Sequence, residues 1–405
     1  MTAKQGAAAA TPRLRFPEYR KAQPWLVKRF DQLLTIGSGR DYKHLGPGDI
    51  PVYGSGGYML SVDDYLYEGE SVCIGRKGTI DRPVFLSGKF WTVDTLFYTH
   101  SFTDCLPRFV FLHFQNIDWK KHNEAGGVPS LSKTNIEKIE VAVPSIAEQQ
   151  KIADCLTSVD EVIAAQGRKV EALKAYKRGL MQQLFPREGE TRPRLRFPEF
   201  RNIPQWKETP LGELVDLLSG FPFDGKDIVE DSTGERLMRG INITEGVIRH
   251  NDEMDRYYLG TTEGLEKYRL AANDLVIGMD GSKVGKNSAL VTEKDAGALL
   301  VQRVARLRAK SLPLINFIFH QIHSPRFHSY VDRINTSSGI PHISAMQIKE
   351  YSIHSTSELE QQRIADCLSS LDSQITAESN QLVTLKAHKQ GLMQQLFPAP
   401  ESASA

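Results

Sequence analysis

Residues 148–186 read EQQKIADCLTSVDEVIAAQGRKVEALKAYKRGLMQQLFP, and a close copy, EQQRIADCLSSLDSQITAESNQLVTLKAHKQGLMQQLFP, returns at residues 360–398. About 24 of these 39 positions are identical, without a gap, at a shift of 212 residues. A second pair of copies, PRLRFPEYR at 12–20 and PRLRFPEFR at 193–201, supports the same division. Because a solenoid repeats every ~20–50 residues, the longer period predicts a duplicated domain.

Both copies show the a/d pattern of a coiled-coil helix, in which seam residues recur in alternating steps of four and three. The first copy supplies Ile152, Leu156, Val159, Ile163, Gln166, Val170, Leu173, Lys177, Leu180 and Leu184. The second supplies Ile364, Leu368, Leu371, Ile375, Glu378, Leu382, Leu385, Lys389, Leu392 and Leu396. Each helix is predicted to end at its Phe-Pro pair, since proline cannot continue the hydrogen-bond ladder. Two matched seams in one chain predict that the helices pair, and a pseudo-two-fold relation makes the pair antiparallel. A coiled coil that only dimerises the chain is the alternative.

Two seam positions are polar in both copies. Gln166 and Glu378 lie near the middle of their seams, where an antiparallel pairing brings them together and a polar pair can fix the register. Lys177 and Lys389 lie nearer the helix ends, where we expect their ammonium groups to reach water.

The segments between the repeated helices share a pattern but almost no sequence. Both contain short apolar strands separated by Gly and Pro turns, which predicts mixed α/β modules with a common fold and different loops. The predicted fold class is α/β of the α+β type, with two globular modules separated by two long antiparallel coiled-coil helices in a pseudo-two-fold repeat. The predicted parts are an N-terminal tail with the first PRLRFPE segment (1–19), the first module (20–147), the first helix (148–186), a linker with the second PRLRFPE segment (187–200), the second module (201–359), the second helix (360–398) and a tail (399–405).

The loops of both modules carry side chains that suit DNA. Arg and Lys can pair with guanine in the major groove and Asn with adenine, although many such contacts reach only phosphate. In the first module the candidates are Arg40, Lys43, His44, Arg76, Lys77, Lys120, Lys121, His122 and Lys133. In the second they are Arg236, Arg239, Asn242, Lys283, Lys286, Ser337, Ser338 and His342. Any one of them could be an ordinary solvated residue, but the set predicts a DNA-binding face.

Composition limits the remaining functions. The 405 residues are 40% apolar and carry a net charge of +1, which neither demands nor excludes nucleic acid. No apolar run reaches the ~18 residues that span a bilayer, so we expect no membrane contact, and we interpret MTAKQGAAAATP as a disordered tail, not a signal peptide. The four cysteines lie far apart and the 11 histidines lack metal-ligand spacing. We therefore predict free thiols, no metal site and a cytoplasmic protein.

No catalytic motif is found. GSKVGKNS at 281–288 resembles a phosphate-binding loop, but Asp280 stands at the first glycine position and Asn287 follows Lys286 in place of Ser or Thr. The chain also lacks the Asn-Pro-Pro-aromatic tetrapeptide that amino-methyltransferases use. We predict no catalytic residue and no cofactor bound by this chain.

The full arrangement resembles the specificity (S) subunit of type I restriction-modification systems. The resemblance rests on EQQKIA at 148–153 and EQQRIA at 360–365, each placed after a variable module, and on the LMQQLFP endings. The PRLRFPE segments and the YGSGGY, GRKG and LSGFPF pieces are similar to that family as well. It covers nearly the whole chain, from about residue 12 to residue 398, and the LMQQLFP endings resemble the IC subclass most.

The resemblance implies two target recognition domains, each reading one half of a split sequence in double-stranded DNA, and repeated helices that act as a spacer. It implies a non-catalytic subunit on which two modification subunits dock, bringing S-adenosylmethionine for adenine methylation. Restriction subunits that use ATP and magnesium would then join the complex. We expect docking on the outer faces of the repeated helices, which would explain identities outside the seam at Ala153-Asp154, Lys174-Ala175 and Gln182-Gln183.

Two functions of other classes stay open. One is a stand-alone DNA-modifying enzyme, a nuclease or a methyltransferase. The other is a structural adaptor that binds only proteins.

Overall fold

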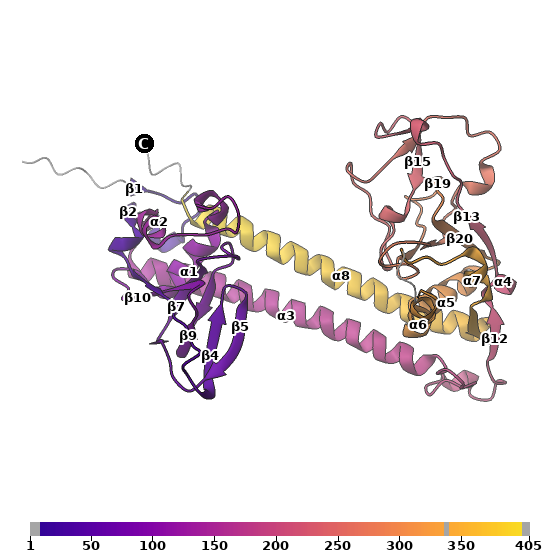
Figure 1. Cartoon of the computed structure of the whole chain (residues 1–405), viewed down its shortest axis with the longest axis horizontal. Helices are drawn as coiled ribbons and strands as arrows, with labels where there is room; N and C mark the ends of the chain where they lie inside the picture. Colours follow the sequence, from indigo (N-terminus) through magenta and orange to yellow (C-terminus); the bar gives the residue numbers. More distant parts are fainter. Residues whose placement is uncertain (1–8, 336–339, 399–405) are drawn as a thin grey trace, which may run out of the picture. The chain divides into compact units, whose positions relative to one another are not determined.

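The computed structural model describes residues 9–335 and 340–398, which form two compact units (Figure 1). Unit 1 holds the described part of Met1–Arg168 and of Ser379–Ala405, and unit 2 that of Lys169–Glu378. The division passes through both long helices, α3 (Ile146–Leu184) and α8 (Glu358–Leu396). Each unit therefore holds the start of one long helix and the end of the other, whereas the predicted boundaries follow the linear order of the chain.

Unit 1 is built on three small sheets. The first has the antiparallel order β1–β2–β11, from β1 (Ala9–Ala10), β2 (Trp25–Arg29) and β11 (Glu140–Val143). The second, also antiparallel, has the order β3–β10–β7–β8, from β3 (Thr35–Ser38), β10 (Leu96–His100), β7 (Ser71–Gly75) and β8 (Val84–Leu86). The third has the order β5–β4–β9–β6, from β5 (Gly57–Val62), β4 (Pro47–Gly54), β9 (Lys89–Thr92) and β6 (Tyr67–Glu68), and its β4–β9 pair is parallel. Its short helices are α1 (Pro107–Asn116) and α2 (Lys133–Lys138), with 3-10 turns η1 (Pro17–Tyr19), η2 (Phe30–Gln32) and η3 (Trp119–His122).

Unit 2 repeats this plan in its second sheet and in the parallel strand pair of its third. β12 (Lys207–Pro210) pairs with β21 (Ser352–Ser355), as β2 pairs with β11. The second sheet has the order β13–β20–β17–β18, from β13 (Val215–Ser219), β20 (Val304–Ala309), β17 (Leu275–Gly278) and β18 (Ser288–Leu290). The third has the order β14–β16–β15–β19, from β14 (Ile228–Val229), β16 (Tyr257–Tyr258), β15 (Glu235–Met238) and β19 (Leu299–Leu300), and its β15–β19 pair is parallel. Its other helices are α4 (Leu211–Leu214), α5 (Leu312–Ile322), α6 (Pro325–Ile334) and α7 (Ala345–Glu350), with 3-10 turns η4 (Pro198–Phe200), η5 (Gly225–Asp227), η6 (Gly240–Asn242) and η7 (Glu266–Tyr268). The α+β class and the common fold of the two modules are confirmed.

One glycine has the same steric role in both units. A Cβ at Gly39 would lie 2.0 Å from the Val93 carbonyl oxygen, and a Cβ at Gly220 would lie 2.1 Å from the Val301 carbonyl oxygen. The chain therefore needs glycine where it crosses the turn that leads into β10 or β20. The shared contact makes these two turns structural equivalents.

In each unit the start of one long helix packs beside the end of the other. In unit 1 a single apolar cluster contains residues of both helices: Ile152, Leu156, Met393 and Leu396. In unit 2 the corresponding residues are Ile364, Leu368, Met181 and Leu184. The helices are therefore antiparallel within each unit, and every predicted seam residue is buried or half-buried.

The two seam lysines correct an expectation. The Lys177 ammonium lies 2.5 Å from an oxygen of Asp372, and the Lys389 ammonium lies 2.7 Å from an oxygen of Asp160. Their side chains are only 16% and 14% exposed, so they pair with carboxylates and do not extend into water. The meeting of Gln166 with Glu378 stays a prediction, because these residues belong to different units.

The repeated PRLRFPE segments attach to the starts of the long helices by the same ion pair. Arg15 lies 2.7 Å from Glu148, and Arg196 lies 2.7 Å from Glu360, with all four side chains at most 9% exposed. Each glutamate lies in the first turn of its helix, where the helix dipole favours a carboxylate. We call α3, α8 and the two PRLRFPE segments the frame.

Three further expectations concern the tails, the outer helix faces and the membrane. Ala9–Ala10 form β1, so the predicted disordered stretch is wrong from that point on, while residues 1–8 and 399–405 lie outside the described residues. Ala153 and its repeat Ala365 are each 1% exposed inside the cores. Core packing therefore explains their identity, and docking is not needed for it. Among the described residues no helix is long and apolar enough to cross a bilayer.

Candidate nucleic-acid interface

In unit 1 the loop after β7 lies against the loop before α2. The Gly78 N–H donates to the Pro129 carbonyl at 2.9 Å, and Lys77 forms an isolated β-bridge with Ser130. This contact holds two predicted DNA-binding residues, Arg76 and Lys77, on the surface, where both are exposed. We call this loop pair the junction of unit 1.

The turn between β9 and β10 connects the junction to a second group of candidates. The Arg76 N–H donates to the Thr95 carbonyl at 2.8 Å. Residues 93–95 also line a cavity of about 570 Å³ together with Lys43 and the glycine-rich tip at residues 54–57. Arg40 hydrogen-bonds Thr92 through its backbone, and the His44 ring packs on Trp91. The structure thus brings Arg40, Lys43, His44, Arg76 and Lys77 around one turn.

The other three lysines predicted in unit 1 pair with carboxylates at 3.3 to 3.9 Å. The pairs are Lys120–Asp81, Lys121–Asp118 and Lys133–Glu137. Exposed pairs of this kind contribute little free energy, so they leave the lysines able to contact phosphate. Lys120 also lines a cavity of about 560 Å³ with Gly78 and Pro129, next to the junction. His122 packs near the Trp119 ring.

Unit 2 has an equivalent junction. The Gly281 N–H donates to the Pro341 carbonyl at 3.1 Å, and Asp280 forms an isolated bridge with His342, which is exposed. Two lysines of the adjoining turn pair with carboxylates, in the pairs Lys283–Glu245 and Lys286–Asp332. Ser337 and Ser338 lie outside the described residues.

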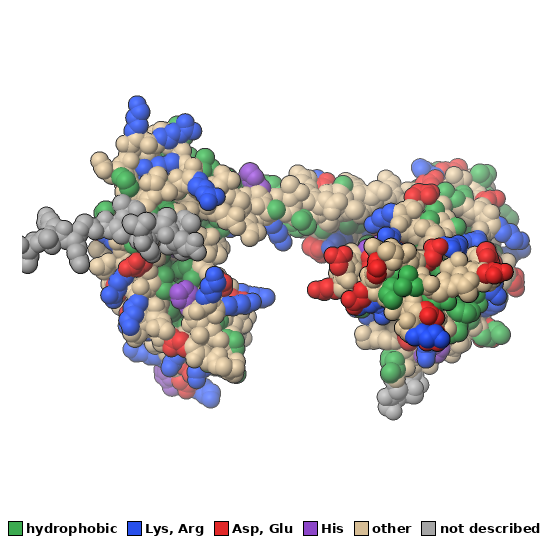
Figure 2. Space-filling view, turned by 90° about the horizontal axis from the view of Figure 1, so that it is seen from above, with side chains coloured by type: hydrophobic (Ala, Val, Ile, Leu, Met, Phe, Trp, Pro, Cys, Tyr) green, Lys and Arg blue, Asp and Glu red, His purple; other side chains and the backbone are tan. Residues whose placement is uncertain are grey.

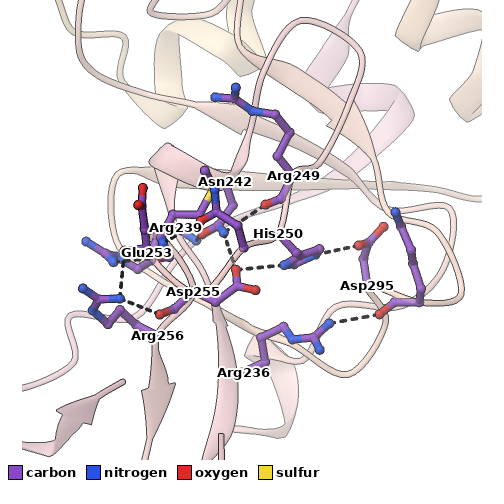
Figure 3. Close-up of polar contacts among 12 residues, drawn as sticks. Arg236, Arg239, Asn242, Arg249, His250, Glu253, Asp255, Arg256 and Asp295 are labelled. Carbon is purple, nitrogen blue, oxygen red and sulfur yellow. Dashed lines mark hydrogen bonds and ion pairs between the residues drawn. The ribbon is translucent and has the colours of Figure 1, made fainter. Parts of the chain in front are cut away.

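The remaining candidates of unit 2 belong to a separate polar network (Figure 3). Asn242 is 0% exposed. Its amide donates to Asp255 at 2.9 Å and to the Arg249 carbonyl at 3.2 Å, and it accepts from the Arg239 N–H at 3.2 Å. The expectation that Asn242 pairs with adenine is therefore wrong for this conformation, because its donors and acceptor are already used. Arg236 and Arg239 are half-buried and donate to backbone carbonyls of Lys294 and Met254.

His250 extends this network to a neighbouring turn. Its ring nitrogens lie 2.9 Å from Asp255 and 2.8 Å from Asp295, so the ring bridges two carboxylates (Figure 3). Burial raises the pKa of Asp295, but hydrogen bonds from Thr292 and His250 outweigh it and hold the pKa below its usual value. The network therefore holds together β15, which carries Arg236, the turn that begins at Arg239 and the loop that carries Arg249.

The exposed arginines Arg249 and Arg303 of unit 2 are not among the candidates predicted from the sequence. Arg249 follows the apolar run GVI, and its exposed side chain projects from the network (Figure 3). Arg303 lies inside LLVQRVARLR, which reads as one continuous strand. No Gly, Pro or Asn marks the turn that the structure places there, so the sequence carries no signal for it.

The two units differ in how charged side chains are distributed over the surface. In the face that Figure 2 shows, Lys and Arg side chains spread over unit 1 with some Asp and Glu side chains between them, whereas on unit 2 acidic side chains gather beside the basic ones. Among residues 9–335 and 340–398, no group of three or more His, Cys, Asp or Glu side chains could hold a metal ion.

A match to a protein-family model identifies the family of this chain. The type I restriction modification DNA specificity domain matches residues 23–175 and again residues 204–387. The chain belongs to this family. Each matched range covers one module and most of the long helix that follows it, which confirms the resemblance to specificity subunits. The IC subclass stays a prediction.

Relatives among characterised proteins carry the same description. The chain is 24% identical over 342 residues to the type I restriction enzyme MjaVIII specificity subunit of Methanocaldococcus jannaschii, covering 82% of this chain and 77% of the relative. It is 28% identical over 225 residues to the EcoAI specificity subunit of Escherichia coli, covering 55% of this chain but 36% of that protein.

Solved structures show the same fold. The S subunit of the type I restriction-modification system from M. genitalium superposes with a TM-score of 0.65 at 13% identity, covering 96% of this chain and 99% of the other. A chain from a structural study of complex assembly and conformational transition of the type I system gives a TM-score of 0.56, also at 13% identity, covering 94% and 97% of the two chains. At this identity the likeness establishes the fold alone.

Proposed function

We propose that this chain reads a bipartite DNA target, one half with each unit, and presents that target to modification subunits that it binds. The observation that supports this most directly is the contrast between frame and loops. The Arg–Glu and Lys–Asp pairs of the frame recur in both units. The equivalent junctions carry different side chains, with Arg76 and Lys77 in one and Asp280 and His342 in the other. A repeated frame that carries different loops suits two domains that recognise different DNA sequences.

The partners follow from the family and from the repeat. Two equivalent frame ends suit two copies of one partner, which we propose are the methyltransferase subunits. S-adenosylmethionine would bind in those subunits, and ATP with magnesium in restriction subunits that join later. This chain supplies recognition and scaffolding and does no chemistry itself. Its place of action would be the bacterial cytoplasm.

The long helices would set the spacing between the two half-sites. A helix rises ~1.5 Å per residue, so a 39-residue helix such as α3 is about 58 Å long. One turn of B-DNA is ~34 Å. The helix is thus longer than one turn of B-DNA, so a frame of this length is sufficient for two recognition domains that bind half-sites one turn apart.

Mapping methylated adenines in a host that carries the full system tests the proposal. The mapped target should consist of two specific parts separated by a gap of fixed length. Exchanging residues 20–147 for the corresponding module of another family member should change one part and leave the other intact. An unchanged methylation pattern after the exchange would favour the protein-binding adaptor.

The isolated chain gives a second test. Because its net charge is only +1, we expect partner subunits to supply much of the phosphate contact. The chain alone should therefore bind DNA weakly and without sequence preference, and the complex tightly. Methylation or cleavage by the purified chain, supplied with S-adenosylmethionine and magnesium, would instead support the stand-alone enzyme.

A further inference from the structure

The turn that leads into β20 places an arginine where turns of this kind favour glycine. The Val304 N–H donates to the Val301 carbonyl at 3.2 Å and closes the turn. Arg303, the third residue, has φ of +73°. A third residue with positive φ is typical of a type II turn, and glycine or asparagine fills that position at least steric cost.

The side chain gains little that would offset this cost. It is 61% exposed, and its Nε lies 3.8 Å from the nearest oxygen of Asp280, which is a long contact. The described residues with positive φ other than glycine are Ser101, Asp104, Asn273 and Arg303, and the last is the one with a long cationic side chain. A backbone cost without a compensating contact in the free protein points to a contact made elsewhere.

Comparison with unit 1 shows where that contact would be. There the Leu96 N–H closes the equivalent turn onto the Val93 carbonyl, and the third residue is Thr95, whose carbonyl accepts from the Arg76 N–H at 2.8 Å. In unit 2 the Arg303 carbonyl accepts from the Met279 N–H, also at 2.8 Å. This backbone hydrogen bond therefore involves an arginine in both units. In unit 1 the arginine, Arg76, is the donor, and in unit 2 the arginine, Arg303, is the acceptor.

We infer that Arg303 reads a base edge in the half-site bound by unit 2, as the counterpart of Arg76 in unit 1. This inference rests on the proposed function. Arg76 lies in the junction of unit 1, and Arg303 contacts the junction of unit 2 at Met279 and Asp280. A guanidinium can donate to O6 and N7 of guanine in the major groove. In the free chain Asp280 holds the Arg303 side chain loosely, so that DNA can displace the carboxylate.

The test uses the complex of the full chain with its modification subunits and a DNA library randomised over both half-sites. Arg303→Asn keeps a residue that tolerates positive φ but removes the guanidinium. It should fold as the wild type does and lower discrimination at one position of one half-site about 10-fold, the scale of a bidentate arginine–guanine contact. Arg303→Lys should keep affinity better than it keeps that discrimination, since lysine cannot form the bidentate contact. Arg76→Asn should relax a position in the other half-site.

Arg333→Ala is the matched control, because Arg333 is 63% exposed and pairs with Glu188 at 3.5 Å, much as Arg303 pairs with Asp280. It should leave the sequence preference unchanged. The inference is overturned if Arg303→Asn methylates the library like the wild type, or weakens all sequences equally as a lost phosphate contact would. A wild-type complex that methylates no sequence would refute the proposed function and the inference with it.

Discussion

Lys177 on α3 donates to both carboxylate oxygens of Asp372 on α8, at 2.5 and 2.6 Å, and the pair recurs in unit 1 between Lys389 and Asp160. Both members keep the shift of 212 residues that relates the two long helices. Each pair places a cation from one seam beside an anion from the other helix. A slip of one helix by a heptad would separate both pairs, so they specify the antiparallel register.

Asp372→Ala should lower the free energy of unfolding of unit 2 by about 1–2 kcal/mol, because it leaves the half-buried Lys177 ammonium without its carboxylate. Replacing both members with leucine should recover most of that loss, since no charge then stays unpaired. Hydrogen exchange of unit 2 measures the change. Asp366→Ala, at an exposed position of α8, is the control; an equal effect of both alanines would show that the pair contributes nothing.

Glu148→Ala should destabilise unit 1 by about 3–5 kcal/mol, because it leaves the buried Arg15 guanidinium uncompensated. The Trp25 indole N–H, which lies 3.2 Å from Glu148, also loses its acceptor. Glu360→Ala should act similarly in unit 2, where the Thr356 hydroxyl takes the place of that indole. Denaturant unfolding measures both variants against Glu161→Ala, on an exposed face of α3. Losses no larger than that of the control would contradict the role assigned to the Arg–Glu pair.

Acid should weaken unit 1 through His113. Burial lowers the pKa of His113 to about 4, whereas histidine in an unfolded chain titrates near ~6.5. Between these values the unfolded state binds more protons, so stability is fully present above pH ~6.5 and falls as the pH drops toward 4, by about 3 kcal/mol for this residue.

His113→Gln should reduce that pH dependence without loss at neutral pH. Unit 2 carries the matching arrangement, since Gln321 donates to the His354 carbonyl at 2.8 Å as His113 Nε2 contacts the Ala142 carbonyl at 3.1 Å. Unfolding free energies at several pH values from 4 to 7 measure the difference. His388→Gln, at an exposed position, should keep the wild-type slope; an identical slope for His113→Gln would rule the explanation out.

Lengthening both helices together should lengthen the gap in the DNA target. Seven residues inserted after Lys174 and seven after Lys386 preserve the heptad phase and keep both Lys–Asp pairs at their ends. Each helix grows by about 10 Å, equivalent to about three base pairs at ~3.4 Å each. Methylation mapping reads the gap. A single insertion after Lys174 breaks the pairing and should impair folding, and an unchanged gap in the doubly extended chain would refute the spacer role.

The sequence determined the features that depend on local periodicity and on the repeat. The seam residues from Ile152 to Leu184 followed from spacing, because the buried face of a helix is set by its own 3.6-residue turn. The copies at 148–186 and 360–398 predicted a common fold for two modules with unlike loops, and the strand order of the second sheet agrees between the two units. The GRKG loop with Arg76 and Lys77 was also identified correctly as an exposed surface loop.

Only the tertiary structure decided which polar groups meet. Asp372 lies 195 residues from Lys177 along the chain, and no local pattern selects it over other carboxylates. Asn242 reads as a DNA-binding side chain until its burial beside Asp255 is seen, since a polar residue looks the same in sequence whether water or protein satisfies it. Arg303 reads as part of a strand until its positive φ places it at a turn. Periodicity determines which face of an element is buried, whereas long-range packing determines the partner of each polar group.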